Sequence, residues 1–328
     1  MLKIGVLGAG HLGKIHLKCI NLANQHYELV GFHDPDPDAA RAAAEQYHTR
    51  AFDSVAALIE AVDVVDIVTP TTTHFAVAKK AMEAGKHVFI EKPLTNTVSE
   101  AEQLLQLSKE KGIKVQVGHV ERFNPALLAL EGIQLDPMFV EAHRLAIFNP
   151  RGTDVSVILD LMIHDLDIVL SMVKAPVVQV SASGVAVVSD TPDIANVRLE
   201  FENGAVANLT ASRISLKQMR KVRLFQQEAY ISLDFLEKQA QIVRLFDQPQ
   251  TDRQNMMELS TRNGTRYITI DMPDIEPVNA IKLELETFAE SIVQNKRPRV
   301  AIEDGYRALK LAHQIIETID HQASKILP

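Results

Sequence analysis

The segment ILDLMIHDLDIVL, residues 158–170, places ionisable side chains inside an otherwise apolar run. If this segment is a helix, Asp160, His164 and Asp167 stand at positions i, i+4 and i+7 and share one face. Asp165 then points elsewhere. Burying such groups among leucine and isoleucine costs free energy unless they are paired or used. A histidine titrates near neutrality, so this stripe suits proton transfer.

Two other interpretations of the polar stripe stay open. Oxygen and imidazole ligands suit several metal ions, so Asp160, His164 and Asp167 could bind one. No further histidine or cysteine cluster lies nearby in the sequence, and we predict no metal site. The stripe could also be structural, and for Asp167 alone we favour this reading, with the carboxylate capping a neighbouring segment or pairing with an arginine.

A second candidate group is a lysine in the stretch HVFIEKPLT. Glu91, Lys92 and Pro93 follow a short apolar run that reads as a buried strand. Proline fixes φ and removes a donor, so it sets the direction of Lys92, and the bond between them can be cis. A partly buried lysine at the end of a strand can donate a hydrogen bond to a substrate oxygen.

The N-terminal stretch GAGHLG, residues 8–13, follows a strand and opens a helix, which is the context that a dinucleotide-binding loop requires. Gly8 permits the tight turn, Gly10 lets the backbone approach a pyrophosphate, and Gly13 allows close helix–strand packing. Asp34 ends the second strand, where an acid can accept hydrogen bonds from ribose hydroxyls. The alternative is a glycine-rich turn in some other α/β domain.

A further loop, TPTTTH at residues 69–74, follows another strand, and Pro70 would shape it at the edge of the sheet where ligands bind. It can also be read as a capped helix start with Thr72 or Thr73 as N-cap. The candidate cofactor-binding residues are Gly8, Gly10, His11, Leu12, Gly13, Asp34, Thr69, Pro70, His74, Glu91 and Lys92.

The elements that must position these residues alternate between strand and helix up to residue 120. The expected strands are 3–8, 28–33, 64–69, 87–90 and 113–118, and the expected helices are 11–24, 37–47, 73–84 and 97–111. Thr97 and Glu100 form a capping-box pattern at the start of the last helix. The pattern predicts an α/β fold, with a doubly wound parallel Rossmann sheet in a domain spanning 1–120.

After residue 120 the pattern changes to one helix followed by many strands. A helix is expected at 155–173, strands at 176–188, 194–201, 205–213, 220–226 and 229–234, and closing helices at 278–294 and 304–321. Strand-like segments continue to about 270, and the polar stretch 247–264 reads as a loop or hairpin tip. We therefore predict an α+β domain over 121–328 with a largely antiparallel sheet.

The bulk composition excludes several classes of protein. The 328 residues carry a net charge of −8, which argues against general binding to nucleic acid or to acidic membranes, although local basic patches stay possible. The single cysteine, Cys19, excludes an intrachain disulfide and fits a reducing compartment. The N-terminus makes a poor signal peptide, and no apolar stretch reaches membrane-spanning length. We expect a cytoplasmic protein.

Four stretches together resemble the glucose–fructose oxidoreductase/inositol dehydrogenase (Gfo/Idh/MocA) family. They are GAGHLG, AMEAGKHVFIEKPLT, LDLMIHDLD and, in the second domain, DIANVRLEFENGAVANLTASR. The resemblance implies an NAD(P)-dependent oxidoreductase acting on a sugar-like alcohol. It also implies that Lys92 lies beside the reacting carbon, and that Asp160 and His164 lie on the first helix of the second domain as catalytic residues, with their stripe facing the nicotinamide cleft between the domains.

In such a site, removing hydride from a secondary alcohol requires loss of the hydroxyl proton. His164 would accept that proton, Asp160 would position the base or contact the substrate, and Lys92 would stabilise charge on the oxygen. We expect NAD rather than NADP, because Asp34 would repel a 2′-phosphate and Pro35 and Asp36 follow it instead of an arginine. The cofactor supplies the redox chemistry.

The substrate is predicted from the stretch VGHVERFNPA, residues 117–126, which is similar to the same stretch in the UDP-N-acetylglucosamine 3-dehydrogenases of that family. That similarity implies a nucleotide sugar oxidised at its 3-hydroxyl. A diphosphate needs cationic anchors, and several arginines fall in segments that could face it. The candidate substrate contacts are His119, Arg122, Asn124 and Arg144, with Arg151 and Arg213 in similar segments.

Two alternatives remain for the function. The substrate could be a free polyol or sugar such as inositol, which needs neutral and acidic hydrogen-bonding groups more than arginines. The chain could also be a ligand-sensing regulator that keeps the fold without catalysis, although Lys92, Asp160 and His164 together argue for an enzyme. Within the family the second-domain sheet often forms dimers or tetramers, so we expect a homo-oligomer.

Overall fold

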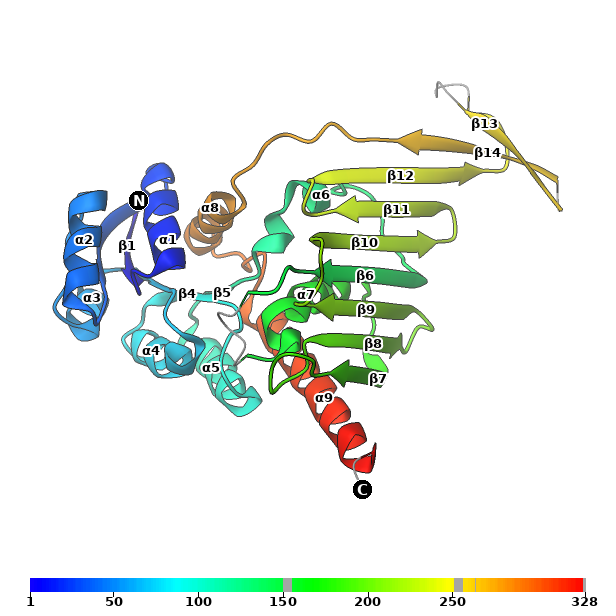
Figure 1. Ribbon diagram of the computed structural model, residues 1–328. Coiled ribbons are helices and arrows are strands. Elements are labelled where there is room, and N and C mark those ends of the chain that lie inside the picture. The colour runs from blue at the N-terminus through cyan, green and yellow to red at the C-terminus, as the bar shows by residue number, and fades with distance from the viewer. Residues whose placement is uncertain (150–154, 251–255, 263, 327–328) are drawn as a thin grey trace. The chain divides into compact units, whose positions relative to one another are not determined.

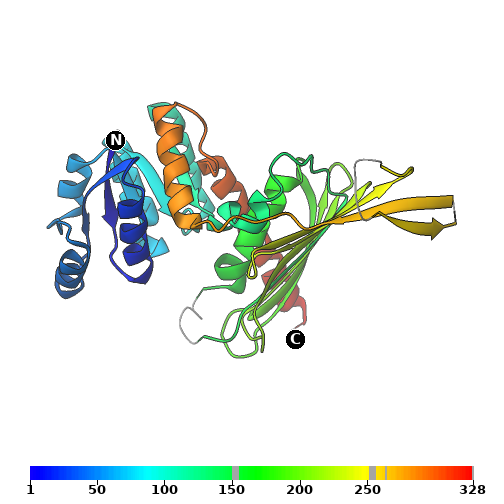
Figure 2. The same ribbon diagram turned by 90° about the horizontal axis from the view of Figure 1, so that it is seen from above.

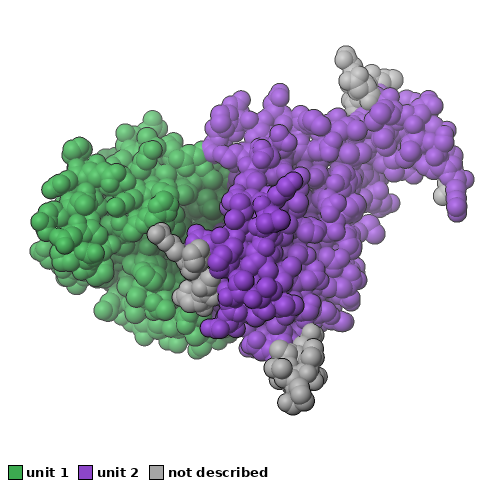
Figure 3. All heavy atoms as spheres, viewed as in Figure 1, with its two compact units in different colours: residues 1–123, 279–310 green, residues 124–278, 311–328 purple. Residues whose placement is uncertain are grey.

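The computed structural model describes residues 1–149, 155–250, 256–262 and 264–326. The chain divides into two compact units, coloured in Figure 3. The Rossmann unit comprises residues 1–123 and 279–310, and the sheet unit comprises residues 124–278 and 311–328. Each unit is described by itself below.

The Rossmann unit is built on a five-stranded sheet in which every neighbouring pair of strands is parallel. The strand order is β2-β1-β3-β4-β5, which is the doubly wound arrangement predicted from the sequence. Figure 1 labels β1, β4 and β5 of this sheet. The strands are β1 Leu2–Leu7, β2 Tyr27–His33, β3 Val64–Ile67, β4 His87–Glu91 and β5 Val115–Gly118. Every residue of β3 and β5 is buried, as expected for strands covered on both faces.

Helices α1 to α5 lie between the parallel strands in the chain, and further helical segments follow β5. They are α1 His11–Leu22, α2 Pro37–Tyr47, α3 Val55–Ala61, α4 Thr71–Glu83, α5 Val98–Lys111, the 3₁₀ turn η1 Val120–Phe123 and α8 Ala280–Val293. The predicted capping box of α5 is present, with Thr97 and Glu100 each bonding the other's backbone. The predicted cap of α4 is wrong, because α4 begins at Thr71 and its N-cap is Pro70.

The sheet unit contains a nine-stranded sheet in the order β13-β14-β12-β11-β10-β6-β9-β8-β7. Its pairs are antiparallel except β6 with β9, which agrees with the predicted largely antiparallel sheet. The strands are β6 Phe139–Leu145, β7 Val177–Val185, β8 Ile194–Phe201, β9 Val206–Ser212, β10 Met219–Gln226, β11 Ala229–Asp234, β12 Gln239–Phe246, β13 Met257–Thr261 and β14 Gly264–Asp271.

Helices cover one face of this sheet and form the core with it (Figure 2). They are α6 Pro125–Leu128, the π-helix η2 Ile158–Met162, α7 Ile163–Met172 and the part of α9 Ile302–Ile326 that follows residue 310. Leu166 on α7 and Ile315 on α9 belong to the same buried cluster as Val197 and Leu209 of the strands. On the opposite face, side chains such as Phe225 are exposed.

The structure differs from the sequence prediction at several elements. The central strand β6 and the short helix α3 were not predicted, and β13 lies inside the stretch 247–264 that was predicted to be a loop or hairpin tip. The prediction also assigned everything after residue 120 to the second domain, whereas α8 and the start of α9 belong to the Rossmann unit. The β6 pattern was obscured because Arg144 occupies one of its buried positions.

Candidate functional site

The glycine loop between β1 and α1 has the backbone geometry that a dinucleotide-binding turn requires. Gly8 has φ +97°, a conformation that a side chain would strain. A Cβ at Gly13 would overlap the carbonyl oxygen of Gly8, so only glycine lets the helix pack this closely on the loop. A Cβ at Gly10 would meet nothing within 4 Å. The space above Gly10 is therefore open.

The start of α1 can receive an anion. Gly10 is its N-cap and makes no side-chain capping bond, and the first turn carries no acidic residue. The free N–H groups and the positive end of the helix dipole therefore face the open space above Gly10. His11 and Leu12 are exposed in the same turn. These residues fit the pyrophosphate of a dinucleotide.

The contrast between Gly10 and Gly13 gives a testable prediction. Gly10→Ala should weaken NAD binding by at least about tenfold, since the methyl group occupies the approach of the pyrophosphate. It should leave the melting temperature nearly unchanged, because the space is open and φ is −65°. Gly13→Ala should lower the melting temperature clearly. Calorimetric titration with NAD and thermal melts would test both; an unchanged NAD affinity in Gly10→Ala would contradict the assignment of this loop.

Asp34, just after β2, is held toward the glycine loop. Its Oδ2 accepts a hydrogen bond from the Ala9 N–H at 2.7 Å, and its Oδ1 accepts one from the Asp36 N–H at 2.9 Å. The nearest downstream arginine, Arg41, pairs with Asp38 on the exposed surface of α2. The carboxylate is therefore fixed beside the turn that would hold a dinucleotide.

The loop after β3 is braced by a histidine. The ring of His74 is buried, with Nδ1 3.0 Å from the Pro93 carbonyl oxygen and Nε2 2.9 Å from the Thr69 carbonyl oxygen. Burial lowers the pKa of His74, against the opposing effect of these carbonyls. This geometry favours a role in joining two loops over the predicted direct cofactor contact. Thr69 is half-buried and Pro70 is exposed, so both remain candidate contacts of the cofactor.

The lysine turn follows β4 as the sequence predicted. Lys92 is half-buried and Pro93 is buried, and the peptide bond between them is cis. Glu91 is 8% exposed, and its Oε2 accepts a hydrogen bond from the Lys92 N–H at 3.1 Å. The backbone on both sides of Lys92 is therefore fixed, which defines where its side chain starts.

In the sheet unit, the polar stripe starts in a π-helix rather than in a regular α-helix. Asp160 lies in η2, and His164 lies in the first turn of α7; both are half-buried. Single-turn π-helices are frequent at functional sites, because the wider turn changes which side chains share a face. Asp167 is buried at 2% exposure, in keeping with the structural role favoured for it.

The aspartate predicted to point away from the stripe, Asp165, pairs with an arginine of the sheet. Asp165 is buried and binds Arg144 of β6 with two contacts, Oδ1 to Nη2 at 2.8 Å and Oδ2 to Nε at 3.0 Å. A bidentate pair of this kind ties α7 to the middle of the sheet. The guanidinium of Arg144 is thus engaged by Asp165, which favours a structural role over the predicted substrate contact.

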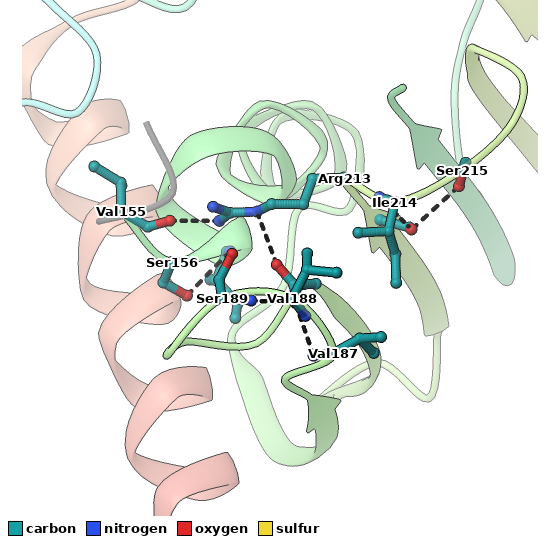
Figure 4. Close-up of polar contacts among 11 residues, drawn as sticks. Val155, Ser156, Val187, Val188, Ser189, Arg213, Ile214 and Ser215 are labelled. Atoms are coloured by element: carbon teal, nitrogen blue, oxygen red, sulfur yellow. Dashed lines mark hydrogen bonds and ion pairs between the residues drawn. The ribbon is translucent and has the colours of Figure 1, made fainter. Parts of the chain in front are cut away.

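A second buried arginine holds the segment in front of η2. Arg213 donates a hydrogen bond to the Val155 carbonyl oxygen, and its Nε lies 4.0 Å from Asp193 (Figure 4). Asp193 also accepts hydrogen bonds from the N–H groups of residues 187–189. Burial would raise the pKa of Asp193, but these hydrogen bonds hold it well below its usual range. Arg213 therefore supports the chain that leads to Asp160.

The remaining predicted substrate residues lie in separate surroundings. His119 is buried and Arg122 is half-buried in the Rossmann unit. Burial raises the pKa of Asp304, but Arg297, Arg307 and, to a smaller extent, Arg122 lower it overall. Asn124, in the sheet unit, caps α6 and donates to the Phe235 carbonyl oxygen at 3.0 Å, so its amide is engaged at both ends. Arg151 lies outside the described residues.

A cluster of three ionisable side chains beside the Lys92 turn was not predicted from the sequence. His16 on α1 and Asp66 on β3 are fully buried and lie in contact with each other, and His16 also contacts Glu91. The signal was present, since polar residues in a buried strand and on a buried helix face are unusual. Over the described parts of the chain, no group of three or more His, Cys, Asp or Glu is placed to hold a metal ion. Likewise, no described helix is long and apolar enough to cross a membrane.

Comparison with known protein families matches both halves of the chain. Residues 2–119 match the family described as "Oxidoreductase family, NAD-binding Rossmann fold". Residues 139–232 match the "GFO/IDH/MocA C-terminal domain". The two matches cover the strands and helices that carry Gly10, Lys92 and His164.

Individual relatives resemble the chain over nearly its whole length. UDP-N-acetylglucosamine 3-dehydrogenase of Acidithiobacillus ferrooxidans is 38% identical over 96% of both chains. A solved structure of that enzyme has a TM-score of 0.87 and covers 98% of both chains at 37% identity. Inositol 2-dehydrogenase of Rhizobium meliloti is 25% identical, over 97% of this chain and 96% of its own.

Proposed function

Because the chain belongs to the Gfo/Idh/MocA oxidoreductase family, whose N-terminal domain is an NAD-binding Rossmann fold, we propose that it oxidises the 3-hydroxyl of UDP-N-acetylglucosamine to a ketone. The observation that supports this substrate is the 38% identity to a UDP-N-acetylglucosamine 3-dehydrogenase along 96% of the chain. The inositol dehydrogenase of Rhizobium meliloti is 25% identical over a similar length.

In this reaction NAD, when bound, accepts the hydride from carbon 3 of the sugar. His164 accepts the hydroxyl proton as the carbonyl double bond forms, so both electrons of the C–H bond and one proton leave the alcohol. Lys92 donates a hydrogen bond to the oxygen as its charge develops. Asp160 orients His164 or the sugar. The glycine loop and Asp34 hold the dinucleotide.

A panel of alcohols tests the substrate. The protein with NAD is given UDP-N-acetylglucosamine, free N-acetylglucosamine, UDP-glucose or myo-inositol, and NADH absorbance is followed. We expect turnover with UDP-N-acetylglucosamine and little with the free sugars, because remote binding of the nucleotide orients the ring. Turnover of inositol without any response to nucleotide sugars would assign a polyol instead. Binding without turnover of any compound would indicate a ligand-sensing regulator.

The cofactor preference gives a second prediction. Asp34→Ala should raise the Kd for NAD by roughly 10- to 100-fold, as expected when the ribose hydroxyls lose the carboxylate to which they donate hydrogen bonds. Because repulsion of a 2′-phosphate is lost as well, the discrimination against NADP should shrink. Asp38→Asn on α2 is the control, since it removes an equal charge nearby. Titration of all three proteins with NADH and NADPH measures this; tighter NADPH binding by the wild type would refute the NAD preference.

We also propose that the protein works in the cytoplasm as a homo-oligomer, joined through the uncovered face of its nine-stranded sheet. On that face Phe225 packs between Phe139 and Tyr230, with ring centroids 5.8 Å and 5.0 Å apart, yet it is 38% exposed. An aromatic cluster of this kind is typical of an interface core. Light scattering after gel filtration should show a dimer or tetramer, and Phe225→Asp should lower the mass. A wild-type monomer would contradict the proposal.

A further inference from the structure

Three ionisable side chains from three different elements meet inside the Rossmann unit. His16 of α1 lies with Nδ1 2.9 Å from Oδ2 of Asp66 on β3 and with Nε2 3.2 Å from Oε1 of Glu91 on β4. His16 and Asp66 are fully buried, and Glu91 is 8% exposed. The ring of Phe89 stands edge-on to the imidazole at 5.6 Å. The cluster is shielded from water, which strengthens each charge interaction.

The two contacts favour a protonated imidazole. A neutral imidazole carries N–H on one nitrogen only, and here both nitrogens lie close to carboxyl oxygens. The contact of Nδ1 with Asp66 is a hydrogen bond, whereas the 3.2 Å contact of Nε2 with Glu91 is an ion-pair contact, which is favourable when His16 is an imidazolium. Burial lowers the pKa of His16, but Asp66 and Glu91 outweigh this effect and raise it well above its usual value. Burial also raises the pKa of Asp66, so both partners favour keeping the proton.

This cluster is linked directly to the lysine turn. Glu91 uses one oxygen for His16 and the other for the Lys92 N–H. Gly118 of β5 lies opposite, and a Cβ there would stand only 2.7 Å from the Glu91 carboxyl group. The carboxylate is therefore confined between His16, the Lys92 backbone and β5.

We propose that His16, Asp66 and Glu91 form a positioning cluster for Lys92, in which one shared proton joins the helix of the glycine loop to the turn that carries the lysine. Loss of that proton leaves one carboxylate without a donor and releases the Lys92 turn. The proposal rests on the role of Lys92 in the proposed function. The other buried titratable groups on the elements packed around the cluster include Cys19 on α1, Tyr27 on β2, His74 on α4 and Glu284 on α8, and the charge of Glu91 acts on His74.

The raised pKa of His16 also determines whether the Lys92 turn becomes more or less ordered as the pH rises. The stabilisation from the cluster is fully present below the unfolded pKa of histidine, and it disappears as the pH rises through the raised folded pKa. The turn is therefore ordered at neutral pH and loosens on the alkaline side. Since a displacement of about 1 Å can cost 10²-fold in rate, kcat should fall at least about tenfold there, with a smaller change in the KM for NAD.

Nuclear magnetic resonance can follow this event without a substrate. Histidine labelled at Cε1 reports the protonation of His16, assigned through His16→Gln, and ¹⁵N-lysine reports the Lys92 amide, assigned through Lys92→Arg. We expect His16 to titrate above the usual pKa of histidine, and the Lys92 amide signal to move with the same midpoint. In the enzyme assay, kcat should fall at that midpoint.

Asp66→Asn is the discriminating variant, because it keeps the size of the side chain. The amide can donate to Nδ1 while His16 donates from Nε2 to Glu91, so a neutral imidazole satisfies both neighbours. The alkaline movement of the Lys92 amide and the matching fall in kcat should therefore vanish. Leu17→Ala is the control on the same helix: it should lower the melting temperature while the two titrations stay coincident.

If the NMR signal of the Lys92 amide does not move as His16 titrates, the proposal is overturned. An alkaline fall in kcat that persists at the same pH in Asp66→Asn would also overturn it, since another group would then cause it. If the Lys92 amide signal follows the titration of His16 but the protein oxidises no sugar, the proposed cluster stands. Only the proposed function is then refuted.

Discussion

Replacing Lys92 by methionine should lower kcat by roughly 10²- to 10³-fold, the loss that follows removal of one donor to a developing oxyanion. Methionine keeps most of the length of the stem but cannot donate a hydrogen bond. The Kd for NAD should change by less than about threefold, because the glycine loop and Asp34 hold the far half of the cofactor. Steady-state rates and titration with NADH measure the two effects separately.

The control for this variant is Lys80→Met, which makes the same change at an exposed position on α4. It should leave both kcat and cofactor affinity near those of the wild type. If Lys92→Met and Lys80→Met behaved alike, Lys92 would have no part in the chemical step. A large loss of NADH binding in Lys92→Met alone would instead assign it to the cofactor.

His164→Asn should lower kcat by about 10²- to 10⁴-fold, the usual contribution of a general base. The base must be neutral to accept a proton, so wild-type kcat should fall on the acid side, and this acid limb should disappear in the variant. Asp160→Asn should also lower kcat. Its kcat should still fall at low pH, but the midpoint of this fall should lie at a different pH. A pH profile of kcat for the three proteins checks the assignment.

His143→Asn on β6 is the matched control, since it makes the same substitution at a half-buried position of the same unit. Its pH profile should retain the acid limb. Near-normal kcat in His164→Asn, with chemistry shown to be rate-limiting by an isotope effect, would remove His164 from the mechanism. Activity that chelators abolish would revive the reading of Asp160 and His164 as metal ligands.

The Rossmann elements could be predicted because their signals are local. The glycine loop, the capping box at Thr97 and the short apolar strands each occupy a few consecutive residues, and the helix predicted at 37–47 matches α2 residue for residue. In the same way, one short motif predicts a different role for each of Gly8, Gly10 and Gly13. The φ angle of Gly8 and the space around Gly10 and Gly13 agree with these roles.

What the sequence did not reveal depends on residues far apart in the chain. Arg144 makes β6 look polar, and its burial is explained by the pairing with Asp165 on α7, which the spacing in the sequence had placed away from the stripe. The cluster of His16, Asp66 and Glu91 joins three elements whose order in the sheet had to be known first. Pairing across the fold has no local pattern, so these contacts could not be predicted.

The central claim is that hydride leaves carbon 3 of UDP-N-acetylglucosamine for NAD. Its most direct test uses the nucleotide sugar deuterated at carbon 3, with mass spectrometry of the reduced cofactor. The account predicts that the NADH formed carries the deuterium, and that Lys92→Met and His164→Asn form it far more slowly. NADH without deuterium, or no NADH from this sugar under conditions where another alcohol is oxidised, would contradict it.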